Sequence, residues 1–243
     1  MKLYPAGSDD TKLYAHFRIG GYNVYNFFDV GKGGTKVDID MTQINKTPLA
    51  KTITSTGTNL SVTVLARPDK QYYSNYFIGT ITAPGNQVNY YYPSEPFAEY
   101  ITKITYKLGN LDYYFTKNSS IIPDKTDTYN GVINTPASTL ATFKPSFSGS
   151  VDYYAGYFES EKSGPGFYMQ LFSPAAAYSA GIKFPDFSKY LGVKSVDLSK
   201  ETLISFALFR DGTFDETRFP YKANGTSSYP DLDLRSVTRN YRP

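Results

Sequence analysis

The sequence predicts an antiparallel all-β fold, either a sandwich or a jelly-roll-like arrangement, with one or two short helices and long connections. Apolar and polar residues alternate along many short segments, as they do in strands that bury one face. Turn residues interrupt these segments about every 8 to 15 positions, a spacing typical of sandwiches and barrels. The 24 Tyr and 17 Phe residues among 243 suit the half-buried surface of a sheet.

The segment 104–115 shows the alternation best. If Gly109-Asn110 forms a two-residue turn, all the apolar residues that alternate on either side of it fall on one face. A two-residue loop that begins with glycine is typical of a type II′ turn. The segment also fits a helical spacing, but its β-branched residues and its glycine favour a β-hairpin.

Similar patterns predict the remaining elements. Hairpin arms are expected at 24–30 with 35–40, at 59–66 with 71–82 and at 153–160 with 166–172, and a further strand at 202–210. One helix is expected over 173–181, because Ser173 can cap it, Pro174 can begin it and Gly181 can end it. A single helical turn is expected over 186–191.

These elements divide the chain into four segments. Residues 1–117 form a β domain or first half, 118–150 a linker or long inter-sheet connection, 151–214 a second β half, and 215–243 a polar C-terminal arm. The arm shows little periodicity. We therefore expect its order to depend on contacts with its own domain or with a neighbouring subunit.

Motifs for nucleophilic or phosphate chemistry are missing from the sequence. The chain has no Cys and a single His, His16, so thiolate chemistry is excluded and a Ser-His triad could use only this residue. The glycine-rich segment 31–34 lacks a following helix, so we interpret it as a hairpin turn rather than a phosphate cradle. We expect no enzyme, no cofactor and no metal site.

Paired carboxylates are the remaining residues that could support catalysis or bind a metal. Such pairs can cleave glycosides or hold Ca²⁺, although here they fit a solvated strand face and turns better. The residues concerned are Asp38, Asp40, Asp211, Asp215, Glu216, Asp231 and Asp233.

Charge and hydropathy exclude other classes of partner. The net charge is +3 and the basic residues are scattered, so nucleic acid is an unlikely partner. No apolar stretch is long enough to predict a transmembrane segment. Residues 1–10 lack an apolar core, so we expect no signal peptide unless a leader has been removed or replaced.

Runs of consecutive aromatic residues are the strongest compositional feature. Neighbouring strand residues face opposite sides of a sheet, so some members of each run are expected to point outward. Outward rings could anchor a protein interface, pack across strands or stack on sugars. The candidate interface or ligand residues are Tyr72, Tyr73, Tyr76, Tyr90, Tyr91, Tyr92, Tyr114, Tyr153 and Tyr154.

Taken with the missing motifs, these features favour a non-enzymatic structural subunit of a larger assembly. A virus or phage capsid, tail or fibre component would bind other copies of itself or other subunits through such rings. The expected location is the virion, the cell surface or the extracellular space. The alternative is a cell-surface carbohydrate-binding β-sandwich module or a surface lipoprotein, with a glycan as its partner.

Overall fold

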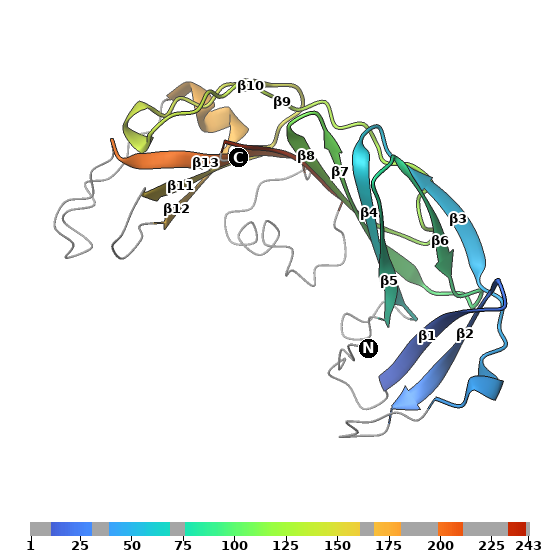
Figure 1. Ribbon diagram of the computed structural model, residues 1–243. Coiled ribbons are helices and arrows are strands. Elements are labelled where there is room, and N and C mark those ends of the chain that lie inside the picture. Colours follow the sequence, from blue (N-terminus) through green and yellow to red (C-terminus); the bar gives the residue numbers. More distant parts are fainter. Residues whose placement is uncertain are drawn as a thin grey trace. The chain divides into compact units, whose positions relative to one another are not determined.

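A computed structural model describes residues 11–30, 39–68, 76–160, 168–180, 199–210 and 233–241, and these residues form mostly antiparallel strands (Figure 1). The predicted all-β class is confirmed. The strands are β1 (Thr11–Ile19), β2 (Tyr22–Val30), β3 (Leu49–Thr54), β4 (Thr58–Arg67), β5 (Tyr76–Ala83), β6 (Gln87–Tyr92), β7 (Glu99–Leu108), β8 (Leu111–Ser119), β9 (Val132–Ile133), β10 (Phe147–Ser148), β11 (Tyr153–Ser160), β12 (Tyr168–Pro174), β13 (Glu201–Arg210) and β14 (Asp233–Asn240). Short 3-10 helices are η1 (Met41–Gln43), η2 (Leu140–Thr142) and η3 (Ala175–Ala180).

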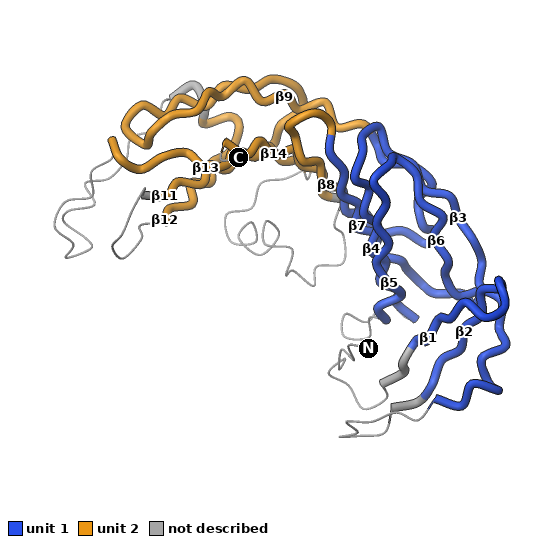
Figure 2. The backbone as a smooth tube through the Cα atoms, viewed as in Figure 1, with its two compact units in different colours: residues 1–107, 115–127, 227–233 blue, residues 108–114, 128–226, 234–243 orange. Residues whose placement is uncertain are grey.

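The strands form one large sheet and three small ones. The large sheet has eight strands in the order β12-β11-β13-β14-β8-β7-β4-β5, and the small sheets are β1-β2, β3-β6 and β10-β9. The chain divides into two compact units (Figure 2). Unit 1 comprises residues 1–107, 115–127 and 227–233, and unit 2 comprises residues 108–114, 128–226 and 234–243.

Unit 1 packs its strands in two layers. The inward face of β4 is fully buried at every second residue, from Leu60 through Val62 and Val64 to Ala66, as the alternation predicted. β6 lies against β4 and β5 and contributes Val88 and Tyr90 to the same core. Each side chain buried in this way stabilises the fold by roughly 1.5–3 kcal/mol, so the paired faces fix the register.

A buried ion pair closes one end of this layer. Arg67, which is almost completely buried, pairs in register with Glu99 on β7, and its Nη1 atom donates to Glu99 Oε2 at 2.7 Å. A buried guanidinium needs such a partner, because removing a charge from water without compensation is costly. The backbone N–H of Ala98 donates to Arg67 O at 2.9 Å, which adds a backbone hydrogen bond beside the ion pair.

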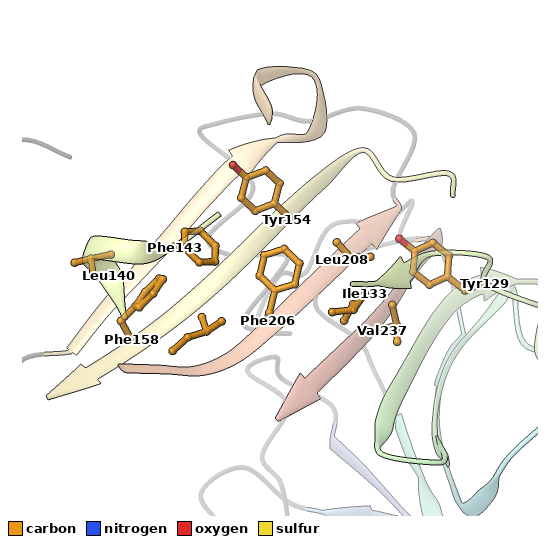
Figure 3. Packing of buried hydrophobic residues seen from close by; sticks show 10 residues of the cluster. Tyr129, Ile133, Leu140, Phe143, Tyr154, Phe158, Phe206, Leu208 and Val237 are labelled. Carbon is orange, nitrogen blue, oxygen red and sulfur yellow. The ribbon is translucent and has the colours of Figure 1, made fainter. Parts of the chain in front are cut away.

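Unit 2 buries both faces of its sheet. Four consecutive residues of β11, 153–156, and four of β13, 206–209, are buried, which a half-exposed strand would not allow. Figure 3 shows that Leu140 and Phe143 pack over Phe158 and Phe206. The segment 128–150, which the sequence marked as part of a linker or long connection, therefore covers one face of the sheet with its side chains.

Most expected strands are present, and one expected helix is corrected. Strand β2 includes the expected arm 24–30, but it pairs with β1 through a turn at Gly20-Gly21, and residues 31–38 lie outside the described part of the chain. The predicted helix over 173–181 is a 3-10 helix that begins at Ala175, because Ser173 and Pro174 still pair with β11. The turn expected over 186–191 also lies outside the described residues.

The Gly109-Asn110 turn follows the expected pattern. β7 ends at Leu108, β8 begins at Leu111, and Gly109 has the positive φ of 62° that a type II′ turn requires at its first position. Of the expected face, Ile104 and Phe115 are buried, whereas Leu108 beside the turn is exposed. Strand β14 belongs to the segment expected to be a polar arm.

Among the described residues, no helix is long and apolar enough to cross a membrane.

Gly57 offers a test of the close approach of backbones in unit 1. A Cβ atom at this position would lie 2.1 Å from the Lys107 carbonyl oxygen, so we expect Gly57→Ala to lower the free energy of unfolding by about 1–3 kcal/mol. Gly85→Ala is the matched control, because its Cβ would meet nothing within 4 Å and neither glycine has a positive φ. Urea unfolding followed by tyrosine fluorescence measures both. Equal losses would contradict the close contact.

Candidate functional site

The β1–β2 hairpin is the most distinctive surface element of unit 1. Its strands pair in register from Thr11↔Val30 to Ile19↔Tyr22. The turn between them consists of Gly20 and Gly21, whose φ angles of 56° and 89° are those that a type I′ turn requires. Glycine adopts these angles without steric cost, so the sequence sets where the hairpin ends.

One face of the hairpin packs on the segment that follows it. Ala15 and Phe28 are buried against Ile44, and Phe17, Val24 and Ile39 border this small core. Asn26 on β2 donates its side-chain N–H to Gln43 O at 2.7 Å, which holds η1 beside the strand.

Tyr25 holds the hairpin from both its backbone and its side chain. Its backbone N–H donates to Lys46 O at 2.9 Å, and its carbonyl accepts from Lys46 N at 3.2 Å. Its hydroxyl accepts from the backbone N–H of Ser94 at 2.8 Å and donates to the Glu95 carboxylate. The Tyr25 side chain is fully buried. Through these hydrogen bonds it joins three segments of unit 1: its own hairpin, the segment at Lys46 and the segment at 94–95.

Charged residues reinforce the hydrogen bonds of Tyr25. We call Tyr25 together with Lys46, Ser94 and Glu95 the anchor of the hairpin. Lys46 Nζ lies 2.5 Å from Glu95 Oε1, with both side chains partly exposed. Burial alone would raise the pKa of Glu95, but the hydrogen bonds from Lys46 and Tyr25 outweigh it and lower that pKa. Burial raises the pKa of Tyr25, and its bond to Glu95 adds to the rise. Glu95 is therefore held as a carboxylate and Tyr25 as a neutral donor.

Aromatic rings cover the other face of the hairpin. Phe27 lies at the centre, with ring centroids 5.4 Å from Tyr14, 5.6 Å from Tyr76 and 6.1 Å from Phe97. The contacts continue from Phe97 to Tyr100 at 5.8 Å and from Tyr100 to Tyr92 at 6.0 Å. Tilted and edge contacts of this kind each add roughly 0.5–1.5 kcal/mol beyond area burial. We call this set, together with Tyr25, the aromatic cluster.

His16 lies between two tyrosine rings at the edge of this cluster. Its ring centroid is 6.4 Å from that of Tyr14 and 5.9 Å from that of Tyr91, and both contacts are stacked. Desolvation lowers the pKa of His16, while a hydrogen bond with Asn23 partly opposes this. The neutral ring thus packs the hairpin against β6, and no described carboxylate is hydrogen-bonded to it as a catalytic orienting group would be.

The end of the hairpin exposes two large apolar side chains. Ile19 is 46% exposed and its cross-strand neighbour Tyr22 is 77% exposed. We call this pair the hairpin tip.

The structure brings three of the predicted aromatic residues together in or beside the aromatic cluster. Tyr76 packs on Phe97 and Tyr91 stacks on His16, while Tyr92 meets Tyr100 edge to face. All three are partly buried.

The other predicted residues lie elsewhere. Tyr90 is buried and donates to Gly79 O at 2.8 Å, so it is not an outward residue. Tyr153 and Tyr154 are also buried: Tyr154 packs against the segment 128–150, and Tyr153 stacks on Phe209 of the neighbouring strand. Tyr114 is partly buried in unit 2, and Tyr72 and Tyr73 lie outside the described residues.

Sequence reasoning missed the hairpin tip and the ring partners Tyr14, Phe27 and Phe97. The signal for the tip was the Gly20-Gly21 dipeptide between two apolar residues, which is a two-residue hairpin pattern. The ring partners had no local signal, because they meet through tertiary packing.

The candidate carboxylates show no shared site in the described part of the chain. Asp40 caps η1 by accepting from Thr42 N at 2.9 Å and from Gln43 Nε2 at 3.2 Å. Hydrogen bonds from Thr42 lower the pKa of Asp40. Its predicted neighbour Asp38, the carboxylates of 211–231 and the Asp233 side chain lie outside what is described. Within the described ranges, no group of three or more metal-ligating side chains occurs.

The anchored hairpin and its aromatic cluster belong to a β-sheet protein that exposes two large apolar side chains beside one turn. In comparisons with protein families, curated proteins and solved structures, the chain matched none of them.

Two tyrosines of β2 provide a matched test of the anchor. We expect Tyr25→Phe to lower the free energy of unfolding by about 1–3 kcal/mol, because it removes the hydroxyl that accepts from Ser94 N–H and donates to the Glu95 carboxylate. Tyr22→Phe should change it by less than about 0.5 kcal/mol, because the Tyr22 side chain is exposed. Urea unfolding compares the two, and a Tyr25→Phe loss no larger than that of Tyr22→Phe would refute the anchor.

Proposed function

We propose that this protein is a non-enzymatic structural subunit of a larger assembly, of the kind found in virus or phage capsids, tails and fibres, and that it acts through protein–protein contacts. The observation that carries the proposal is the hairpin tip, an exposed Ile19–Tyr22 pair at the end of a rigidly anchored hairpin. The corresponding location is the virion or an extracellular surface.

Rigid presentation distinguishes this pair from ordinary exposed apolar residues. Single exposed hydrophobic side chains are common and need no functional explanation. Here the side chains are adjacent across the strand pair, and Tyr25 fixes the hairpin that carries them. A pre-ordered aromatic anchor loses little conformational entropy on binding, and tyrosine is enriched among residues that dominate binding energy.

Carbohydrate binding fits the rings in and beside the aromatic cluster less well. A sugar platform needs the open face of an aromatic ring. Tyr91 has His16 stacked against it, and Tyr76 contacts Phe27 and Phe97. These rings serve the interior packing of unit 1, which favours the assembly proposal over the glycan-binding alternative.

The proposal predicts that the wild-type chain associates and that the tip is required. We expect Ile19→Ser combined with Tyr22→Ser to weaken association at least about 30-fold, as loss of a binding hot spot does. Analytical ultracentrifugation over a concentration series measures the association. Urea unfolding should be nearly unchanged, because both side chains are exposed.

Met41→Ser is the matched control, since Met41 is 50% exposed on η1 and lies outside the hairpin tip. It should leave association unchanged. Equal association of the tip variant and the wild type would overturn the role of the tip.

A further inference from the structure

One face of the β1–β2 hairpin carries a continuous run of apolar side chains. Residues two apart on a strand share a face, and the register pairs Phe17 with Val24 and Ile19 with Tyr22. Exposure rises along this face: the innermost residues are buried, the next cross-strand pair is partly buried and the hairpin tip is exposed. We call this face the apolar stripe, which consists of Ala15, Phe17, Ile19, Tyr22, Val24 and Phe28.

The protein's own chain covers the inner part of the apolar stripe. Ile44 is buried against the inner end of the stripe, and Ile39 borders the same small core. The hairpin tip at the outer end remains exposed. A partner that continues this cover removes apolar surface from water, which favours association. The outer end therefore offers a partner the kind of surface on which the segment 39–46 already packs.

The apolar stripe contains no charged residue. The exposed Arg18 adjoins it in sequence, but alternation places Arg18 on the opposite face with Tyr14 and His16, whose rings stack. In a contact between two copies related by a two-fold axis, each surface meets the same surface of the other copy. Two stripes can meet in this way without the like-charge repulsion that would oppose the contact.

The hairpin tip is also the most concentrated apolar surface in the described part of the chain. Among the large hydrophobic side chains that are exposed there, only Ile19 and Tyr22 are cross-strand partners. Val132, for example, pairs with Ser148. The described surface that best complements the hairpin tip is therefore the tip of another copy. On the basis of the proposed function, we propose that the hairpin tips of two copies pack against each other about a two-fold axis.

Opposite charges at one position can test whether the tips meet. Ile19→Lys and Ile19→Glu should each associate at least about 30-fold more weakly than the wild type, because like charges then meet across the two-fold axis. An equimolar mixture of the two variants should recover at least about 10-fold of this loss, because opposite charges then meet. Arg18→Glu is the matched control on the opposite face and should leave association nearly unchanged.

A covalent test is available because the chain has no native Cys. A single introduced Cys can form a disulfide only with the same position of another copy. Ile19→Cys keeps the stripe apolar, so on oxidation it should give at least about five times as much covalent dimer as Arg18→Cys. Both full-length variants are oxidised at a concentration where ultracentrifugation shows the wild type assembled, and they are then separated under denaturing, non-reducing conditions.

The outcomes separate this inference from the proposed function. Recovery in the mixture is diagnostic, because a tip that met a different surface of the second copy would keep the same partner in the mixture. No recovery and no excess of covalent dimer from Ile19→Cys, with the wild type still assembled, would overturn the contact between tips and leave the proposed function standing. A wild type with a single-chain mass at all concentrations would overturn both.

Discussion

The buried Tyr25 is the constraint on which unit 1 and its proposed contact surface depend. Its backbone pairs with Lys46, and its hydroxyl joins Ser94 and Glu95, so segments far apart in sequence meet at one side chain. Because burying a hydroxyl without a hydrogen-bond partner is costly, the bonds with Ser94 and Glu95 stabilise the buried position of Tyr25. The ring contacts of the aromatic cluster and the position of the hairpin tip follow from this arrangement.

The two units use aromatic residues for different purposes. In unit 1, rings join the hairpin to the strands beside it, and strands such as β4 keep one polar face. In unit 2, Tyr153 stacks on Phe209 at 4.9 Å while Tyr154 packs on Phe206, so consecutive residues are buried on opposite faces of β11. A tyrosine-rich composition therefore reflects packing in two layers as well as the outward rings available to a partner.

Local patterns in the sequence predicted the strands whose burial is decided locally. The alternation of β4 and the glycine of the Gly109-Asn110 turn both appear as expected. The burial of both Tyr153 and Tyr154 could not be predicted, because it depends on tertiary packing such as that of the segment 128–150 over Tyr154. The pairing of β2 with β1 through Gly20-Gly21 was not predicted from the sequence, and most of the arm 35–40 that was expected to pair with 24–30 lies outside the described residues.

The assembly proposal rests on the anchored hairpin and the exposed apolar pair at its tip. Sedimentation equilibrium of the unmodified chain over a hundredfold range of concentration tests it most directly. The account predicts a reversible increase in mass from one chain to a defined oligomer. A single-chain mass throughout the range would contradict it.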